Sequence, residues 1–216
     1  MKISRYGILP LLIIFLLCGG LSAISVYFGF WYLTIIPFLF LLFSINFFRS
    51  PPPPGPKDDS VLYSPANGLV VEVLKGVREE EYIKGEVWKI SIFLNVFDVH
   101  VNSSPVDGVI DYLNYVPGKK LDVRDPRASL ENEYAMMGVK KKDGKKITVR
   151  QIAGLVARRI ICDVKKGDTV TQCGVIGMIR FGSRAEICIP IDSPFTPSVA
   201  VGDRVVCGVS PLGHFK

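Results

Sequence analysis

The chain is poor in the residues that bind transition metals. It has only two histidines, and its five cysteines include no Cys-x-x-Cys pair and none beside a histidine. Structural zinc sites are built from such closely spaced cysteine and histidine ligands, so we predict no metal site. The odd number of cysteines also argues against a disulfide framework, and free thiols are typical of the cytosol.

Charge is missing from the beginning of the chain. No charged residue occurs between Arg5 and Arg49, and no acidic residue occurs in the first 57. A membrane span takes about 20 residues, so this run suffices for two spans and is too long for a signal peptide. We expect a transmembrane helical hairpin over residues 1–48, with helices from about Ile8 to Ile24 and from Trp31 to Phe47. One tilted span followed by an interfacial helix is the alternative.

Basic residues flank both ends of the apolar run. Lys2 and Arg5 precede it, and Arg49 and Lys57 follow it. Positive charge marks the cytosolic side, so the predicted location is the cell membrane with the body of the protein on the cytoplasmic side. The net charge of +6 suits an anionic lipid surface better than nucleic acid, and we expect no nucleic-acid partner. The lysine-rich segment 140–146, predicted as a type I′ hairpin turn, is a candidate for lipid contact.

The rest of the chain is predicted to be mainly β. Residues 49–57 form a stiff Pro-rich linker. Residues 58–216 have short apolar runs between glycine turns and no long stretch with a helical period. We expect a compact β-sandwich or barrel-sandwich-like soluble domain. Strands are predicted at 69–74, 87–101, 109–113, 147–149 and 155–164, with a short helix or loop at 126–137.

Two pairs of segments repeat within this domain. Ser64-Pro65-Ala66-Asn67-Gly68-Leu69-Val70 recurs as Ser104-Pro105-Val106-Asp107-Gly108-Val109-Ile110. Gly167-Asp168-Thr169-Val170 recurs as Gly202-Asp203-Arg204-Val205. Each is a turn that leads into a strand, which indicates two structurally related hairpins.

Polar residues interrupt the predicted strand at 87–101. Side chains alternate along a strand, so Asp98, His100 and Asn102 would share one face. Both faces before this point are largely apolar, and a charged pair in a buried strand is costly, which favours a functional role. The aspartate could fix the tautomer of the histidine. A histidine satisfied at a strand end is the alternative.

Five short segments form a pattern that is more specific than any one of them. The segments are Phe47-Phe48-Arg49-Ser50-Pro51-Pro52, Ser64-Pro65-Ala66-Asn67-Gly68, the run from Phe93 to Asn102, the run from Gln151 to Ile160, and Gly177-Met178-Ile179-Arg180-Phe181-Gly182-Ser183-Arg184. In this order they closely resemble the phosphatidylserine decarboxylase proenzymes, specifically the short membrane-anchored type of archaea and bacteria. The resemblance extends from about Phe47 to Leu212.

The resemblance implies an enzyme that makes its own pyruvoyl cofactor from Ser183. The serine would attack the Gly182 carbonyl, and elimination and hydrolysis would leave a β subunit of residues 1–182 and an α subunit of residues 183–216. His100 would be the base for this serinolysis, and Asp98 would orient it. A monomer and a homo-oligomer of the cleaved subunits both stay open.

The resemblance also implies the reaction. The pyruvoyl group would form a Schiff base with phosphatidylserine, or with archaetidylserine, within the membrane and release carbon dioxide to give the ethanolamine phospholipid. His100 is our candidate for the proton returned to carbon.

One residue departs from the family pattern. The first turn of the family normally reads Ser-Pro-Ala-Asp-Gly, and its aspartate helps to activate the histidine, whereas this chain has Asn67. Asn67 is either natural, with Asp98 or Asp107 compensating, or an engineered block that leaves an uncleaved precursor. Two rival functions stay open: a catalytically inactive phospholipid-binding member, and a membrane adaptor with a lipoyl-like β domain.

Overall fold

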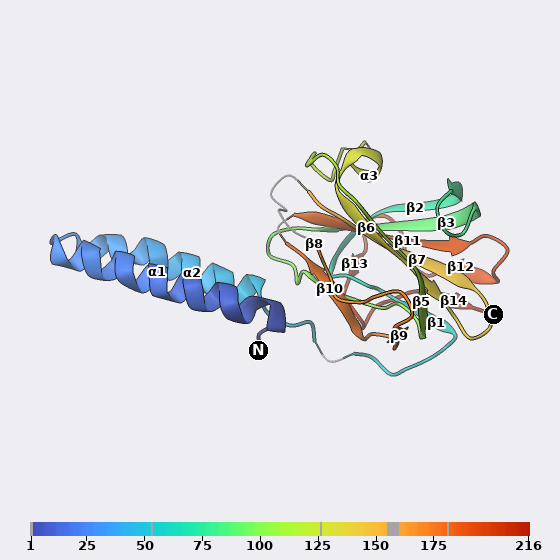
Figure 1. Ribbon diagram of the computed structural model, residues 1–216, viewed down its shortest axis with the longest axis horizontal. Coiled ribbons are helices and arrows are strands. Elements are labelled where there is room, and N and C mark those ends of the chain that lie inside the picture. Colours follow the sequence, from blue (N-terminus) through green and yellow to red (C-terminus); the bar gives the residue numbers. More distant parts are fainter. Residues whose placement is uncertain (1, 53, 126, 155–159, 181) are drawn as a thin grey trace. The chain divides into compact units, whose positions relative to one another are not determined.

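The computed structural model describes residues 2–52, 54–125, 127–154, 160–180 and 182–216. It divides into two compact units, Met1–Ser50 and Pro51–Lys216. The first is helical and the second is mainly β (Figure 1). The mainly β class predicted from the sequence is therefore confirmed.

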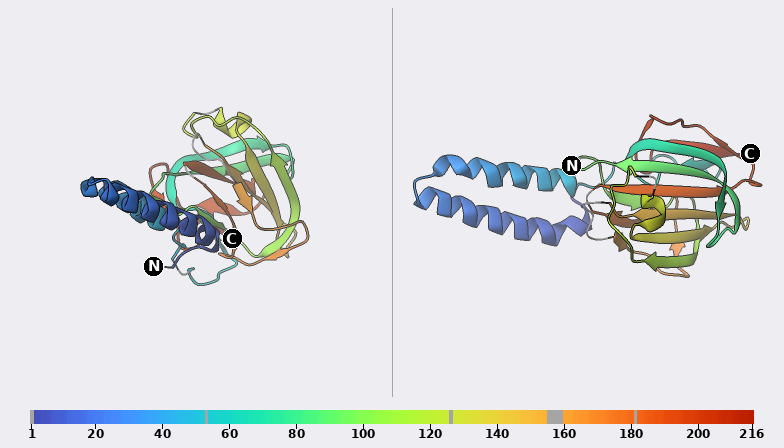
Figure 2. Two further views of the ribbon diagram at one scale, coloured as in Figure 1. Left: turned by 60° about the vertical axis from the view of Figure 1, so that its left-hand side comes forward. Right: turned by 90° about the horizontal axis from the view of Figure 1, so that it is seen from above.

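The helical unit is a hairpin of two antiparallel helices (Figure 2). A turn of 3-10 helix, Arg5–Gly7, leads into α1, Ile8–Tyr27, and a second, Trp31–Thr34, leads into α2, Ile35–Phe47. The 20 residues of α1 extend for about 30 Å, the thickness of a bilayer core. The apolar segment Arg5–Tyr27 is long enough to cross a membrane, and Trp31–Phe47 is a shorter apolar helix.

Backbone hydrogen bonds join the two ends of the hairpin. The N–H of Ser4 donates to the carbonyl of Phe48, and the N–H of Ser50 donates to the carbonyl of Lys2, both at 2.8 Å. The basic residues Lys2 and Arg49 therefore lie at the same end of the helical unit.

The body is organised around a curled antiparallel sheet (Figure 2). Its spatial order is β13, β2, β3, β11, β7, β6, β5, β9. The strands are β2, Gly68–Glu79; β3, Gly85–Leu94; β5, Gly108–Val116; β6, Tyr134–Lys140; β7, Lys146–Ile152; β9, Thr169–Val170; β11, Ser183–Pro190; and β13, Arg204–Val205.

Two three-stranded sheets complete the body. The first has the order β1, β14, β12 (Val61–Tyr63, Pro211–Phe215 and Phe195–Pro197), and the second has the order β4, β10, β8 (Val101–Ser103, Val175–Ile179 and Ile160–Cys162). A one-turn helix, α3, spans Ala128–Glu131. All three sheets contribute to one hydrophobic core, for example through Leu62, Ile92 and Ile176.

The repeated segments occupy equivalent places in this architecture. β13 pairs with β2 at one edge of the large sheet, and β9 pairs with β5 at the other. The N–H of Val70 donates to the Asp203 carbonyl, and the N–H of Ile110 donates to the Asp168 carbonyl, each at 2.9 Å. The two hairpins predicted from the echoes are therefore structurally related.

The predicted strand at 87–101 is wrong in its second half. β3 ends at Leu94, and a turn separates it from β4. Asn95 and Asp98 build this turn: the N–H of Asp98 donates to the Asn95 carbonyl at 3.0 Å, and the N–H of Asn95 donates to the Asp98 carboxylate at 2.9 Å. Such side-chain bonds compete with strand pairing. Phe97, expected on a buried face, is 65% exposed at the turn.

Two smaller expectations also need correction or limits. The lysine-rich turn 140–146 is not type I′, because that type needs positive φ at both central residues. Among the described residues, the non-glycine residues with positive φ are Lys84 and Cys173, and neither lies in this turn. In this turn only Gly144 has positive φ, at +84°.

The predicted strand at 155–164 is described only from residue 160. The segment 126–137, predicted as a short helix or loop, contains α3 and the start of β6.

The shared core predicts where truncation is costly. Ile92 is fully buried in the core, so Ile92→Ala should lower the free energy of unfolding by about 2–5 kcal/mol. Val109 is 42% exposed, and Val109→Ala should change it by about 0.5 kcal/mol or less. Urea unfolding of the full chain in detergent measures both. Equal losses would contradict this assignment of the core.

Candidate functional site

Ser183 is the first residue of β11 and faces the interior. It pairs with Leu94 of β3, and by alternation it shares a face with Ala185 and Ile187, which belong to the core. Its side chain is fully buried, and its Oγ has no hydrogen-bond partner among the described residues. A buried hydroxyl without a partner is costly, which marks this serine as a functional candidate.

Gly182 has the backbone that this position requires. Its φ is +58°, in the left-handed region that favours glycine. Its carbonyl packs against Gly154, because a Cβ added to Gly154 would lie 1.9 Å from the Gly182 oxygen. The carbonyl that precedes Ser183 is thus held by close backbone contact. Phe181, also in the quoted motif, lies outside the described residues.

His100 is fully buried, between the turn and β4. Its Nδ1 lies 2.9 Å from the backbone carbonyl of Asp98. A carbonyl can only accept, so Nδ1 carries the hydrogen and Nε2 is the basic nitrogen of the neutral ring. The His100 carbonyl accepts from the N–H of Ile179 at 3.1 Å, which places His100 beside the end of β10. Ile179 precedes Ser183 by four residues along the chain.

Asp98 contacts the histidine differently from the expectation. The carboxylate was expected to orient the ring, but the backbone carbonyl does so. The carboxylate accepts from the Asn95 N–H at 2.9 Å and forms an ion pair with Arg204 at 3.3 Å. The difference arises because residues 95–98 form a turn and not a strand. Asp98 therefore sets the tautomer of His100 through its main chain.

A buried amide pair links β4 to the face of Ser183, and of its two members the sequence pointed to Asn102 but not to Gln151. The Nε2 of Gln151 donates to the Oδ1 of Asn102 at 2.8 Å, and the Nδ2 of Asn102 donates to the Pro65 carbonyl at 3.3 Å. Gln151 is opposite Ala185 in the register of β7 and β11, so it shares the interior face with Ser183. The available signal was a glutamine on the inward face of β7, whose other inward residues, Ile147 and Val149, are apolar.

Asn67 and Asp107 hold equivalent loops of the two related halves. The Oδ1 of Asn67 accepts from the N–H of Cys207 at 3.1 Å. The Oδ1 of Asp107 accepts from the N–H of Gln172 at 2.5 Å. The loop at Asn67 reaches the neighbourhood of β4, because the Sγ of Cys207 lies 3.1 Å from the Oγ of Ser103.

The next residue of β11, Arg184, faces the opposite side of the sheet from Ser183. There it joins a largely buried charge network with Glu72, Lys89, Ser91 and Glu186. Burial raises the pKa of the Glu72 carboxyl, but hydrogen bonds from Arg184 and Lys89 outweigh burial and lower it to about 2. The ionised carboxylate is thus strongly favoured.

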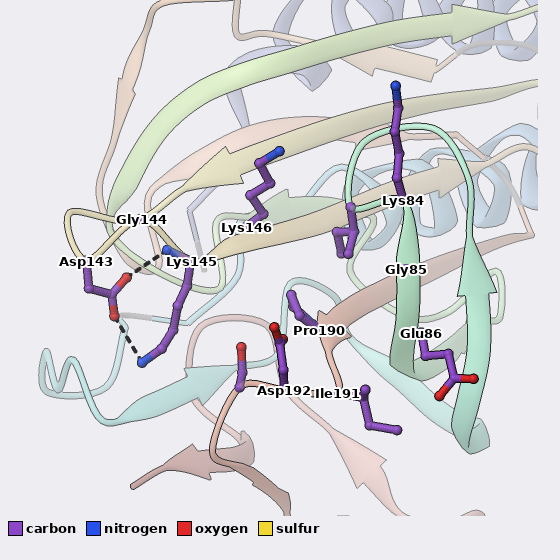
Figure 3. Close-up of a pocket in the computed structure, with 12 residues that line it drawn as sticks. Lys84, Gly85, Glu86, Asp143, Gly144, Lys145, Lys146, Pro190, Ile191 and Asp192 are labelled. Carbon is purple, nitrogen blue, oxygen red and sulfur yellow. Dashed lines mark hydrogen bonds and ion pairs between the residues drawn. The ribbon is translucent and has the colours of Figure 1, made fainter.

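A separate surface pocket of about 660 Å³ lies at the far end of β11 (Figure 3). It is lined by lysines and acids of three turns, and the Asp143–Lys145 ion pair at 3.1 Å lies at its rim. Pro190 also lines it, seven residues from Ser183 or about 23 Å along the strand. This pocket is therefore not part of the site around Ser183.

Comparison with known proteins decides the family. The family model for phosphatidylserine decarboxylase matches residues 40–212. The chain belongs to this family. Phosphatidylserine decarboxylase proenzymes that it resembles include one from Geobacter sulfurreducens, 44% identical over 80% of this chain and 77% of that protein. Another, from Syntrophus aciditrophicus, is 39% identical over 99% of this chain and 97% of that protein. A third, from Desulfotalea psychrophila, is 42% identical over 83% of this chain and 84% of that protein.

Phosphatidylserine decarboxylases are pyruvoyl-dependent carboxy-lyases, and the pyruvoyl group derives from a serine of the proenzyme itself. Membership makes this chain such a self-processing proenzyme. The local structure at Ser183 fits the group, since the serine is buried, its hydroxyl is not engaged by a described residue, and a glycine with positive φ precedes it.

The charge network predicts a pH dependence. The pKa of Glu72 is lowered from 4.5 to about 2 in the folded protein, so its contribution to stability is present above pH 4.5 and is lost as the pH falls towards 2. Glu72→Gln should lower the melting temperature at pH 7 and reduce its dependence on pH between 5 and 3. Thermal unfolding at several pH values measures this.

The control is Glu80→Gln, which removes an ion pair between two exposed side chains, Arg78 and Glu80. It should leave the pH dependence of the unaltered chain intact. If Glu72→Gln shows that same full dependence, the Glu72 carboxylate is not the source of the effect.

Proposed function

We propose that this chain decarboxylates phosphatidylserine, or the archaeal ether lipid archaetidylserine, after self-cleavage between Gly182 and Ser183. The observation that carries the proposal is the buried Ser183 hydroxyl directly after a left-handed glycine. The β subunit would be residues 1–182 and the α subunit residues 183–216. His100 would be the base, supported by Asp98.

The self-cleavage needs only groups of this chain and one water molecule. The Ser183 Oγ attacks the Gly182 carbonyl carbon, the peptide C–N bond breaks, and an ester replaces the amide. Loss of the Cα proton of residue 183 then expels the Gly182 carboxylate and leaves dehydroalanine. Addition of water converts this residue to a pyruvoyl group and releases ammonia. Serine suits the reaction because the same oxygen is first the nucleophile and then the leaving group.

His100 would carry the protons. Its Nδ1–H is held by the Asp98 carbonyl, which leaves Nε2 as the site that takes the Ser183 hydroxyl proton and returns it to the departing amide nitrogen. In the mature enzyme the pyruvoyl group supplies an electron-accepting carbonyl for decarboxylation. We propose that His100 then donates a proton to the carbon that has lost carbon dioxide, which gives the ethanolamine phospholipid.

Two substitutions test these roles. In a chain that also carries Asn67→Asp, which restores the family aspartate, Ser183→Ala and His100→Ala should each leave the chain at full length on a denaturing gel and abolish carbon dioxide release from phosphatidylserine vesicles. The matched control is His214→Ala, because His214 is exposed on β14 and should tolerate the change. Efficient cleavage of His100→Ala would remove His100 from the role of base. Normal cleavage of Ser183→Ala would refute the proposed cleavage site.

Asn67 is proposed to slow self-cleavage. An amide keeps the acceptor that binds the Cys207 N–H but lacks the charge that favours a protonated histidine. Because oxygen and nitrogen are similar in size, an aspartate should fit the same loop.

We therefore expect Asn67→Asp to speed conversion to the two subunits by at least about tenfold, in the direction seen when a triad carboxylate is compared with its amide. Conversion is followed on a gel from the time of synthesis. Asp107→Asn, in the equivalent loop of the other half, is the control and should leave the rate unchanged. If Asn67→Asp cleaves no faster, another group supplies the charge.

We also propose that the helical unit is a transmembrane hairpin of residues 1–48, that 49–57 is a linker, and that 58–216 is a catalytic domain of barrel-sandwich type on the cytoplasmic side. Large apolar side chains of the helices are exposed, for example Phe15 at 59% and Leu16 at 63%, and lipid would cover them. The basic residues Lys2 and Arg49 lie at the same end of the hairpin. The exposed lysine turn 140–146 supports attraction to an anionic lipid surface.

Cysteine reporters test this topology. An impermeant thiol reagent should label Phe30→Cys, in the turn between the helices, on intact cells, and should label Lys142→Cys only after the cells are opened. The reporters are placed in a chain whose partly buried Cys162 and Cys173 are replaced by serine, and that chain without a reporter is the control. Burial raises the pKa of Cys188 and of Cys207 to about 12 and keeps them unreactive. Labelling of Lys142→Cys on intact cells would place the body outside and contradict the proposed topology; labelling of Phe30→Cys as well would then indicate a single crossing, and its absence an inverted hairpin.

Carbon dioxide release also separates the rival functions. A membrane adaptor with a lipoyl-like domain or an inactive phospholipid-binding member would release none, with or without the Asn67→Asp change. A lipoyl-like domain would also require a modified lysine, which intact mass would reveal.

A further inference from the structure

Self-cleavage changes how residue 183 is held. In the precursor a peptide bond fixes it on each side, whereas in the mature enzyme it is the first residue of the α subunit. Chain termini are poorly ordered unless other contacts hold them. The reactive residue therefore needs an anchor within its own subunit, a requirement that rests on the proposed cleavage site.

The strand pairing alone holds residue 183 on one side only. β11 pairs with β3 from Ser183 onward, where Ser183 is opposite Leu94. On the other side, pairing with β7 begins one residue later, where Arg184 is opposite Ile152. Arg184 is therefore the first residue of the future α subunit with neighbours on both sides.

The side chain of Arg184 is bound more extensively than its position on the strand requires. It is only 3% exposed, and its guanidinium forms ion pairs with Glu72 of β2 and, at 3.0 Å, with Glu186. Its Nη2 also donates to the Oγ of Ser91 on β3 at 2.9 Å. Its Nη1 donates to the carbonyl of Val123 at 3.4 Å. These partners come from three strands and from the segment before α3.

Other cations share the two carboxylates without replacing Arg184. Lys89 lies 3.0 Å from Glu72 and 3.6 Å from Glu186, and Arg150 lies 4.0 Å from Glu186. A lysine at 184 would present one ammonium in place of a planar fork, so it could not reproduce this set of bonds. Because lysine is also a cation and the carboxylates keep Lys89 and Arg150 as partners, such a change should weaken the anchor without changing the charge of the network.

We propose that Arg184 is a positioning residue, whose bonds to Glu72, Ser91 and Glu186 hold the pyruvoyl-bearing end of the α subunit in place for turnover. Arg184 acts on the opposite face of the sheet from residue 183, so it does not touch the substrate. The anchor is dispensable before cleavage, when the peptide bond to Gly182 holds residue 183, and it is required afterwards.

The experiment compares Arg184→Lys with Arg150→Lys, both in the Asn67→Asp background. Arg150 contacts Glu186 from the adjacent strand and is the matched control. Cleavage of Arg184→Lys should stay within about threefold of its parent. Its kcat on phosphatidylserine vesicles should fall by at least about tenfold at nearly unchanged KM, since small misplacements of reacting groups are costly. Amide hydrogen exchange at residues 184–187 of the mature α subunit should become faster.

Arg150→Lys should leave the kcat and the exchange at residues 184–187 unchanged. The proposal is overturned if Arg184→Lys keeps the full kcat and the full exchange protection. It is also overturned if the folded variant loses as much of its cleavage rate as of its kcat. If Arg184→Lys does not fold, Ser91→Ala takes its place, because it removes one hydrogen bond to the guanidinium. Ser91→Ala should lower the kcat and leave cleavage normal. A full kcat in Ser91→Ala overturns the proposal. Mass spectrometry of the Asn67→Asp parent maps the cleaved bond. A parent that is not cut between Gly182 and Ser183 refutes the proposed function, whereas the outcomes above concern only the role of Arg184.

Discussion

The alternation of side chains at the start of β11 is the constraint on which the site depends. Successive residues of a strand face opposite sides, so Ser183 lies in the interior and Arg184 in the charge network outside. The interior position separates the Ser183 hydroxyl from bulk water. On the opposite face, Arg184 binds its carboxylate partners, which do not form hydrogen bonds with the Ser183 hydroxyl. A shift of one residue in register would exchange the two environments and place a charged guanidinium in the core. Eight residues of β11 pair with β3 and five with β7, which makes such a shift costly.

The repeated turns show how a chain of this length builds the surroundings of that strand. β13 and β9 close the two edges of the large sheet in the same way, and the loops that follow Ser64 and Ser104 use the same serine-to-carbonyl bond at 2.7 Å. Asn67 and Asp107 stand at corresponding positions, and each accepts a backbone N–H. The residue that departs from the family pattern therefore has a structural duty in addition to its proposed effect on His100.

Local patterns were enough to predict the helical hairpin, the mainly β body and the relation between the repeated turns. The quoted motifs also identified Ser183 and His100 as candidates. Alternation along one continuous strand predicted the place of His100, however, and the Asn95–Asp98 turn breaks that strand. That turn forms because two short polar side chains satisfy the backbone locally, a choice that hydrophobic alternation does not reveal. Gln151 and the bonds of Arg184 to Ser91 and Glu72 depend on partners 49 to 112 residues away, which no local pattern specifies.

The most direct test of this account is the intact mass of the small subunit from the Asn67→Asp chain, measured before and after borohydride treatment. The account predicts one fragment that begins at residue 183, carries a pyruvoyl group in place of serine and an amino terminus, and gains the mass of added hydrogen on reduction. A decarboxylating chain that keeps its full-length mass, or one cut at any other bond, would contradict the central role of Ser183.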